Sequence, residues 1–292
     1  MMSKNYRRET QVWSKVVVSI VFLTLFFLQP CPASNAAGEK GKSVFYLVSV
    51  GVGDADLITV RAINTIKESD VIVCRQKTKE KFAEYLKGKE FLDSSLGSWR
   101  YYGKDCSKIK DRKKRGKCEE NRKKRAKLIS EIRSVIVRGE TVAVLDSGDP
   151  LIYGPRVWYL EEFEDLNPVV IPGVSCFNAA NAALGKGVTR GKETHSVVLT
   201  TRREVEKLSE YHPTMVIFTM GTKFEELVKK LNGLYPAETP IAVVVYAGYK
   251  EKERVVRGRL NTILEQTGGE KFPFEHLVYV GDFLEQRMKK AR

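Results

Sequence analysis

The sequence is poor in the residues that build metal sites. Its 292 residues include five cysteines and three histidines. No two cysteines form a CxxC pair, and the histidines are scattered, so the sequence predicts no zinc site and no other metal site. Internal repeats are also lacking.

Acidic residues are outnumbered, with 36 Asp and Glu against 50 Lys and Arg, and the formal net charge is +14. Such an excess suits an acidic partner, which can be nucleic acid, an anionic membrane surface or a polycarboxylate small molecule. The hydrophobic share of 42% excludes wholesale disorder. The length is enough for two domains with cores of their own.

Residues 1–37 are predicted to be a signal peptide or a membrane anchor. Basic residues precede an apolar run of thirteen residues, Val16–Leu28, and small residues follow it. The run is shorter than the ~20 residues of a membrane-spanning helix, which favours a cleaved signal. Either interpretation exports the body, to the periplasm in a bacterium, with possible membrane association through the N-terminus. The body is cytoplasmic if the segment is not a signal.

A basic insert lies at residues 104–127, where thirteen Lys or Arg stand against four Asp or Glu. Trp99, Tyr101 and Tyr102 lie just upstream, and aromatic residues beside basic ones can bind nucleic acid. A solvated helix or a mobile loop is the commoner explanation of such a charge run. In an exported protein Cys106 and Cys118 can form a disulfide, while free thiols are an equal alternative.

The rest of the body alternates strands and helices. The apolar runs Val44–Val50 and Val71–Cys74 flank a stretch with helical spacing, which predicts a β-α-β unit and a parallel sheet. Further strands are expected at residues 141–145, 169–171, 196–201, 214–219, 240–246 and 276–280. We therefore expect an α/β fold with two α/β domains, at residues 43–163 and 168–288.

Four predicted strands end in small or polar residues: Gly51–Asp54, Ser147–Pro150, Met220–Thr222 and Ala247–Gly248. Ligands of open α/β sheets bind outside the carboxyl ends of strands, and glycine lets a ligand approach the backbone. "GVGD" alone is a weak signal, because a dinucleotide site would also need a third glycine and an acidic residue after the second strand. "SGDPLIYG" is more specific. Its aspartate either accepts hydrogen bonds from a ligand or ties the turn to local amides.

Four segments in this order resemble the tetrapyrrole (corrin/porphyrin) methylase family. They are "YLVSVGVGDADLITVRAINTIKESDVIV", "LDSGDPLIYG", "IPGVSCFNAANAALG" and "VVVYAGYKEKERVVRGRL". The spelling of "GDPLIYG", "PGVSCFNAANAALG" and "RVVRG" is most similar to the branch that methylates precorrin-4 at C11 in cobalamin synthesis. Three features depart from the family pattern: Val52 where many members have proline, the basic insert, and the signal-like N-terminus.

The resemblance implies two α/β domains with S-adenosylmethionine in a cleft between them, a tetrapyrrole substrate and a homodimer. Carried over by position, the cofactor-binding residues are Ser147, Gly148, Asp149, Ile152, Ser175, Cys176, Met220 and Gly248.

Asp54 is the candidate proton acceptor for methyl transfer to a ring carbon, although capping the following helix is an alternative role. Arginines that could pair with the substrate's carboxylates are Arg61, Arg156, Arg254 and Arg257. Two other functions stay open. One is an RNA methyltransferase of the same fold, for which the insert argues although nucleic acid is not the favoured partner. The other is an exported tetrapyrrole-binding protein without catalysis.

Overall fold

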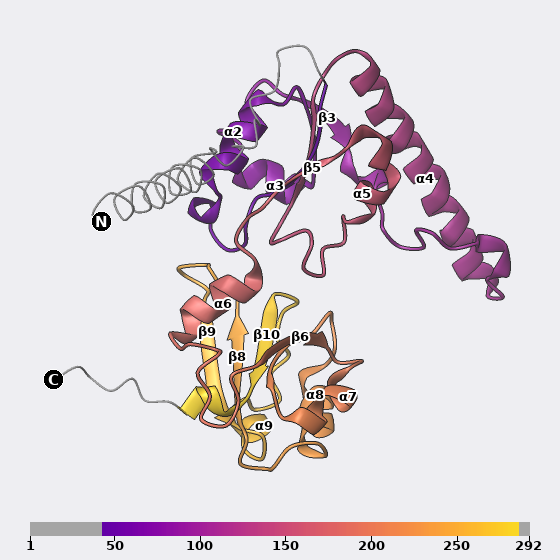
Figure 1. The fold of residues 1–292 in the computed structure, drawn as a ribbon. Coiled ribbons are helices and arrows are strands. Elements are labelled where there is room, and N and C mark those ends of the chain that lie inside the picture. Colours follow the sequence, from indigo (N-terminus) through magenta and orange to yellow (C-terminus); the bar gives the residue numbers. More distant parts are fainter. Residues whose placement is uncertain (1–42, 286–292) are drawn as a thin grey trace, which may run out of the picture. The chain divides into compact units, whose positions relative to one another are not determined.

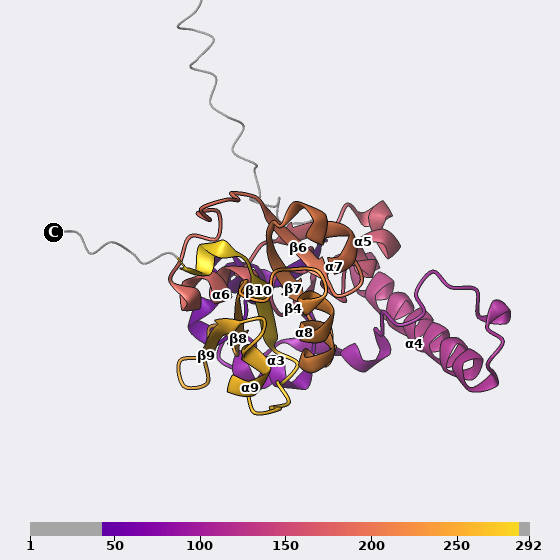
Figure 2. The ribbon, with the colours of Figure 1, turned by 90° about the horizontal axis from the view of Figure 1, so that it is seen from below.

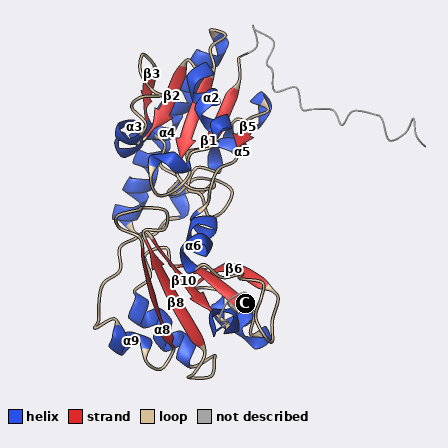
Figure 3. Cartoon of the chain, turned by 90° about the vertical axis from the view of Figure 1, so that its left-hand side faces the viewer, coloured by secondary structure: helices blue, strands red, loops and turns tan. Residues whose placement is uncertain are grey.

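A computed structural model describes residues 43–285. This part of the chain contains two five-stranded sheets flanked by helices (Figures 1 and 3). The predicted signal or anchor at residues 1–37 lies outside the described residues. No helix between residues 43 and 285 has the length and apolar character needed to cross a membrane.

The first sheet is parallel throughout, as predicted, with strand order β3-β2-β4-β1-β5. The strands are β1 (Phe45–Ser49), β2 (Val71–Cys74), β3 (Glu90–Asp93), β4 (Val142–Asp146) and β5 (Val169–Ile171). The expected second domain begins at residue 168, but β5 pairs with β1, so the chain leaves the first sheet only after Ile171. The division into domains otherwise stays a prediction.

Side chains alternate between the two faces of this sheet, and both faces are buried, as a parallel sheet requires. One face packs on the helices α4 and α5, and the other on α2 and on Phe82 and Leu86, which follow α3. The bounds are α2 (Val60–Glu68), α3 (Gln76–Lys81), α4 (Arg112–Val137) and α5 (Trp158–Glu162). Leu128, Ile132 and Val135 form the buried stripe of α4, at the helical spacing expected.

The second sheet is mixed, with order β6-β7-β10-β8-β9. Only β6 and β7 are parallel, and β10 lies between β7 and β8, antiparallel to both. The strands are β6 (Val197–Thr201), β7 (Thr214–Phe218), β8 (Pro240–Val245), β9 (Arg254–Arg259) and β10 (His276–Val280). Four of the five were expected within one or two residues; β9 and the directions of the strands were not.

One face of the second sheet is covered by α8 (Phe224–Asn232), with α7 (Val205–Leu208) and α9 (Ile263–Gln266) beside it. The other face packs on α6 (Cys176–Leu184). Gly185 ends α6 with φ +62°, a left-handed conformation that favours glycine. Short 3-10 turns lie at Ala55–Leu57, Ser94–Leu96, Cys106–Lys108, Glu164–Leu166, Ser209–Tyr211 and Asp282–Glu285.

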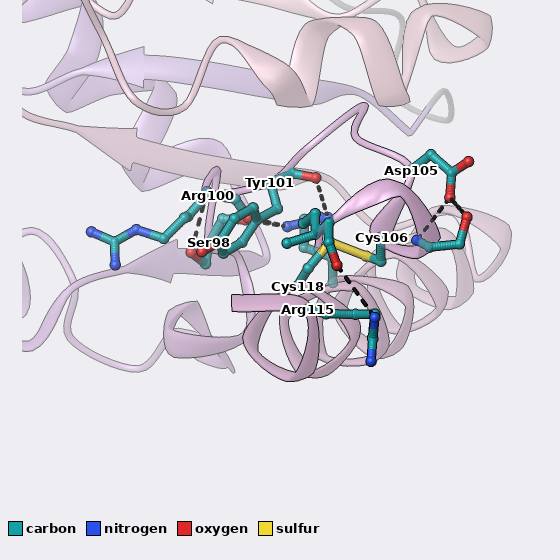
Figure 4. Close-up of a disulfide and its surroundings, with 10 residues drawn as sticks. Ser98, Arg100, Tyr101, Asp105, Cys106, Arg115 and Cys118 are labelled. Atoms are coloured by element: carbon teal, nitrogen blue, oxygen red, sulfur yellow. Dashed lines mark hydrogen bonds between the residues drawn. A yellow bond between two sulfur atoms is a disulfide. The ribbon is translucent and has the colours of Figure 1, made fainter. Parts of the chain in front are cut away.

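The basic insert is ordered as a helix and a fastened loop. Its loop folds back on α4, and a disulfide joins Cys106 to Cys118 with 5.7 Å between their Cα atoms (Figure 4). Of the two states that the sequence left open for Cys106 and Cys118, a disulfide or free thiols, the structure has the disulfide. The guanidinium of Arg125, about two turns beyond Cys118 in α4, is buried and donates to the carbonyl oxygens of Ser98 at 2.7 Å and Arg100 at 3.0 Å.

Candidate functional site

The ends of the two central strands of the first sheet are joined to each other. Gly148, after β4, donates its backbone N–H to the carbonyl oxygen of Gly51, after β1, at 2.9 Å. The Ser49 hydroxyl donates to the carbonyl oxygen of Gly148. Both glycines have positive φ, +72° and +76°, which other residues adopt at a cost. The two candidate turns therefore form one paired structure.

The "SGDP" turn is held by its aspartate. One carboxylate oxygen of Asp149 accepts from the Leu151 backbone N–H at 2.8 Å, so the local role considered from the sequence is present. The second oxygen has no hydrogen bond within residues 43–285, and the side chain is partly exposed. Ser147 is exposed next to it, with its N–H donating to the buried Asp146 carboxylate at 3.1 Å. Asp149 can therefore serve the turn and still accept from a ligand.

Tyr153, which sequence reasoning did not single out, connects this turn to the second sheet. Its backbone is left-handed, with φ +55°. Its hydroxyl donates to the carbonyl oxygen of Leu199 in β6 at 3.1 Å, and its ring lies 4.6 Å from the ring of Phe218 in β7. The signal was present in "DPLIYG", but only the fold shows which strands this tyrosine meets.

A second connection joins the "GVGD" turn to the end of β8. A Cβ atom added to Gly53 would lie 2.6 Å from Gly248 Cα, closer than any real contact. The Asp54 N–H donates to the Gly248 carbonyl oxygen at 2.9 Å, and the Lys250 N–H donates to the Asp54 carboxylate at 2.9 Å. Glycine is therefore required at both positions because two backbones meet there.

The expected capping role of Asp54 is not observed. Asp54 precedes the 3-10 turn Ala55–Leu57, yet its side chain makes no cap hydrogen bond there. Helix α2 is capped instead by Thr59, which accepts from the Ala62 N–H at 3.2 Å. The carboxylate of Asp54 faces Lys250 because the turn at β8 supplies a nearer donor.

Lys81, at the end of α3, also reaches the "GVGD" turn. Its ammonium group donates to the Gly53 carbonyl oxygen and lies 5.5 Å from the centre of the Tyr249 ring. Burial lowers the pKa of Lys81, and the nearby Asp54 carboxylate opposes that shift. No local motif predicts a role for Lys81 at this turn, because its partners Gly53 and Tyr249 are distant in sequence.

The segment after β5 places two further candidates. Ser175 is buried and caps α6: its hydroxyl accepts from the Asn178 N–H at 3.3 Å and donates to the Asn178 side-chain oxygen at 2.8 Å. That hydroxyl is therefore occupied, and a ligand would meet Ser175 through its backbone. Burial raises the pKa of the neighbouring Cys176 thiol to about 11, so Cys176 is an apolar surface rather than a nucleophile at neutral pH.

Apolar residues from three candidate segments meet on the α6 face of the second sheet. Ile152 and Cys176 pack against the same buried cluster as Phe218 and Ala247. Met220, two residues beyond Phe218, has φ +50° and is 52% exposed. The fold thus packs Ile152 and Cys176 against one cluster and leaves Met220 exposed.

Most of the arginines proposed for the substrate are engaged elsewhere. Arg156 is buried and lies 3.2 Å from the Asp146 carboxylate, beneath the "SGDP" turn. Burial raises the pKa of Asp146, and the Arg156 guanidinium opposes the shift. Arg254 pairs with Glu270, and Arg257 donates to the Leu184 carbonyl oxygen at 3.0 Å. Arg156 is therefore a structural residue, while Arg61 is exposed.

These groups suit S-adenosylmethionine chemically. The Asp149 oxygen can accept from the hydroxyl or amino groups of such a ligand, and the apolar side chains of Ile152 and Cys176 suit its adenine and methylene groups. The glycines place no side chain between a ligand and these turns, whose backbone groups are held by hydrogen bonds within the protein. The residues present therefore fit the cofactor that the sequence resemblance implied.

A model of the family Tetrapyrrole (Corrin/Porphyrin) Methylases matches residues 44–264. The chain belongs to this family. Among similar relatives are two proteins of Methanocaldococcus jannaschii. Its cobalt-precorrin-4 C(11)-methyltransferase is 28% identical, covering 82% of this chain and 87% of its own. Its uroporphyrinogen-III C-methyltransferase is 30% identical, covering 81% and 94%.

Solved structures of tetrapyrrole methylases share the fold. A cobalt-precorrin-4 methyltransferase of cobalamin biosynthesis aligns with a TM-score of 0.63 at 21% identity, covering 83% of this chain and 96% of its own. A uroporphyrin-III C-methyltransferase from Thermus thermophilus, solved with S-adenosylhomocysteine, aligns with a TM-score of 0.60 at 18% identity, covering 85% and 98%. The α/β class with two sheets, expected from the sequence, is confirmed.

Proposed function

We propose that this chain transfers a methyl group from S-adenosylmethionine to a ring carbon of a precorrin, with precorrin-4 or its cobalt form methylated at C11. Family membership makes it a tetrapyrrole methyltransferase, and S-adenosylmethionine is its methyl donor. The finer assignment is supported by relatives named for C11 methylation of precorrin-4. Uroporphyrinogen III is the alternative substrate, supported by a relative of 30% identity.

The observation that carries the proposal is the paired turn of Gly51 and Gly148 with the open oxygen of Asp149. When bound, S-adenosylmethionine supplies an electrophilic methyl group, so the protein's task is alignment. Gly148 and Gly248 hold the turns in place through backbone hydrogen bonds, and the second oxygen of Asp149 can accept a hydrogen bond. Ile152 and Cys176 exclude water from one side.

Asp54 is our proposed proton acceptor for the methylated carbon. The Lys250 N–H engages one of its carboxylate oxygens, which holds the side chain in place. The other oxygen has no hydrogen bond within residues 43–285 and can take a proton. Asp54→Asn keeps an acceptor for Lys250 but removes the base. We therefore expect a much lower kcat with cofactor affinity unchanged, and a fall in both would contradict this role.

Cofactor binding is tested by calorimetric titration of the purified protein with S-adenosylmethionine and S-adenosylhomocysteine. We expect micromolar affinity, weakened about tenfold by Asp149→Asn, since one hydrogen bond to a charged group contributes about 1.5 kcal/mol or more. Met220→Ala should also weaken binding. Val137→Ala, at an 86% exposed position on α4, is the control and should change nothing.

The same titration separates the alternatives. If a folded protein takes up precorrins but neither cofactor form, the chain is a tetrapyrrole-binding protein and the methyltransferase proposal fails. If RNA binds with a steep salt dependence and accepts methyl groups, the RNA methyltransferase is correct. The assay that decides the substrate offers precorrin-4 and uroporphyrinogen III in parallel with labelled methyl donor.

We also propose that the protein is exported and forms a homodimer. The disulfide between Cys106 and Cys118 supports export, because disulfides persist in oxidising compartments. Fractionation of the producing cells, with thiol alkylation before lysis, tests this. A cytoplasmic protein with both thiols alkylated would refute export. Light scattering of the purified protein tests the dimer, and a monomeric mass at assay concentrations would refute it.

A further inference from the structure

The basic insert, residues 104–127, has more Lys and Arg side chains than its ion pairs and hydrogen bonds engage. Of its thirteen Lys and Arg, three form ion pairs, Lys108, Lys124 and Lys127. Two others, Arg115 and Arg125, donate to backbone carbonyl oxygens. The remaining eight are exposed and have no salt bridge within residues 43–285.

The charge also stands where it weakens the helix. The first turn of α4, Arg112–Arg115, is entirely basic and contains no acidic residue. The N-terminal end of a helix carries partial positive charge, so cations there are unfavourable. Only the cap Asp111, which accepts from the Lys114 N–H at 2.8 Å, offsets this. A local conflict of this kind is expected where function, not stability, sets the sequence.

The insert is nevertheless held in a fixed form. The disulfide fastens its loop to α4, and Arg115 donates to the Ile109 carbonyl oxygen at 3.4 Å (Figure 4). Arg125 joins the helix to residues 98–101 and lies 5.6 Å from the Tyr102 ring. Figure 2 shows this end of α4 extending beyond the strands of the first sheet. The exposed Lys and Arg side chains of the insert, which repel one another, are therefore held on a helix and a loop that the disulfide fixes in place.

The chemistry of the surface limits its partner. From Arg112 to Lys124 the only apolar side chain is Cys118, which is buried in the disulfide. A shallow hollow beside it, of about 390 Å³, is lined by Ser98, Trp99, Arg100, Lys117, Glu120 and Asn121. Such a surface has no apolar face to insert into a protein groove or among acyl chains. It suits a flat array of phosphates, contacted by long basic side chains.

We infer that the basic insert binds the anionic headgroups of a phospholipid membrane. Two surfaces offer dense phosphates, nucleic acid and lipid headgroups. The disulfide and the predicted N-terminal signal or anchor favour the lipid, because nucleic acid belongs to the reducing cytosol. Trp99, which is 56% exposed beside the hollow, suits the headgroup region, where tryptophan is enriched. The insert would hold the catalytic body at the membrane surface.

The test is sedimentation of the full chain with vesicles of phosphatidylcholine alone or with added phosphatidylglycerol. Neutral vesicles measure any binding through the N-terminal segment. The variant reverses four unpaired charges: Lys113→Glu, Lys114→Glu, Lys117→Glu and Lys123→Glu. The matched control reverses four exposed lysines elsewhere that also have no salt bridge within the described residues: Lys77→Glu, Lys87→Glu, Lys192→Glu and Lys271→Glu.

We expect the insert variant to bind anionic vesicles at least about 100-fold more weakly, since each basic residue near the surface contributes about fivefold. The control should lose far less, and binding by the unchanged protein should fall with salt. Circular dichroism and cofactor titration of both variants verify that the fold is kept. Equal losses in both variants, no preference for phosphatidylglycerol, or tighter binding to an RNA oligonucleotide than to vesicles would each overturn the proposal.

Discussion

The contact between Gly53 and Gly248 gives the sharpest prediction. Gly53 has φ +66°, and a Cβ atom there would lie 2.6 Å from Gly248 Cα. An alanine at this position costs about 1–2 kcal/mol for its left-handed backbone alone. It must also push the two turns apart, which breaks the hydrogen bonds from Asp54 to Gly248 and from Lys250 to Asp54. Each bond contributes about 1 kcal/mol. We therefore expect Gly53→Ala to lower the free energy of unfolding by about 3–4 kcal/mol.

Gly103→Ala is the matched control for this measurement. Gly103 has nearly the same φ, +69°, but no atom lies within 4 Å of an added Cβ. Its loss should be only the backbone share, about 1–2 kcal/mol. Urea denaturation of both variants gives the difference, and cofactor titration should show weaker binding only for Gly53→Ala. If the two variants lose the same stability, the close approach of the turns does not shape the site and the argument is wrong.

Three further predictions concern buried groups. Arg156→Met should lower stability by about 3–5 kcal/mol in urea denaturation, because it leaves the buried Asp146 carboxylate without its cationic partner; Asp146→Asn added to it should restore part of the loss. The disulfide between Cys106 and Cys118 closes a short loop, so its reduction should lower the local stability of the insert by about 3 kcal/mol. Hydrogen exchange should then become faster at the start of α4 and stay unchanged in both sheets. The Cys176 thiol should resist alkylation at pH 8, and rapid alkylation of the folded protein would contradict this. Its pKa is about 11 in the folded protein, against an ordinary 9.0 in the unfolded chain. The free energy of unfolding should therefore fall as the pH rises from 9 towards 11, because the thiol of the unfolded chain ionises first.

The elements were largely predictable because their signals are local. The buried strands β2 and β10 have the predicted bounds, and the stripe Leu128, Ile132 and Val135 follows from helical spacing. Ser175 caps the N-terminal end of α6 and Gly185 the C-terminal end, positions at which serine and glycine are common. The family motifs also located the strand-end turns correctly, since each motif combines several constrained residues.

Long-range relations were not predictable in the same way. Nothing near β1 indicates that β4 lies between it and β2, or that β5 completes the first sheet. The capping role considered for Asp54 and the substrate contact considered for Arg156 are not observed, because each side chain takes another partner, which only the fold identifies. The Gly53–Gly248 contact joins residues that no local pattern connects.

The position of β10 has a consequence for the order in which the molecule is made. This strand bridges β7 and β8 in the middle of the second sheet, although it is the last strand in sequence among the described residues. During synthesis, β7 and β8 therefore each keep one edge without a hydrogen-bonded neighbour until residue 280 has left the ribosome. The first sheet can close long before that. A nascent chain stalled after β9 would hold one finished sheet and one open to aggregation.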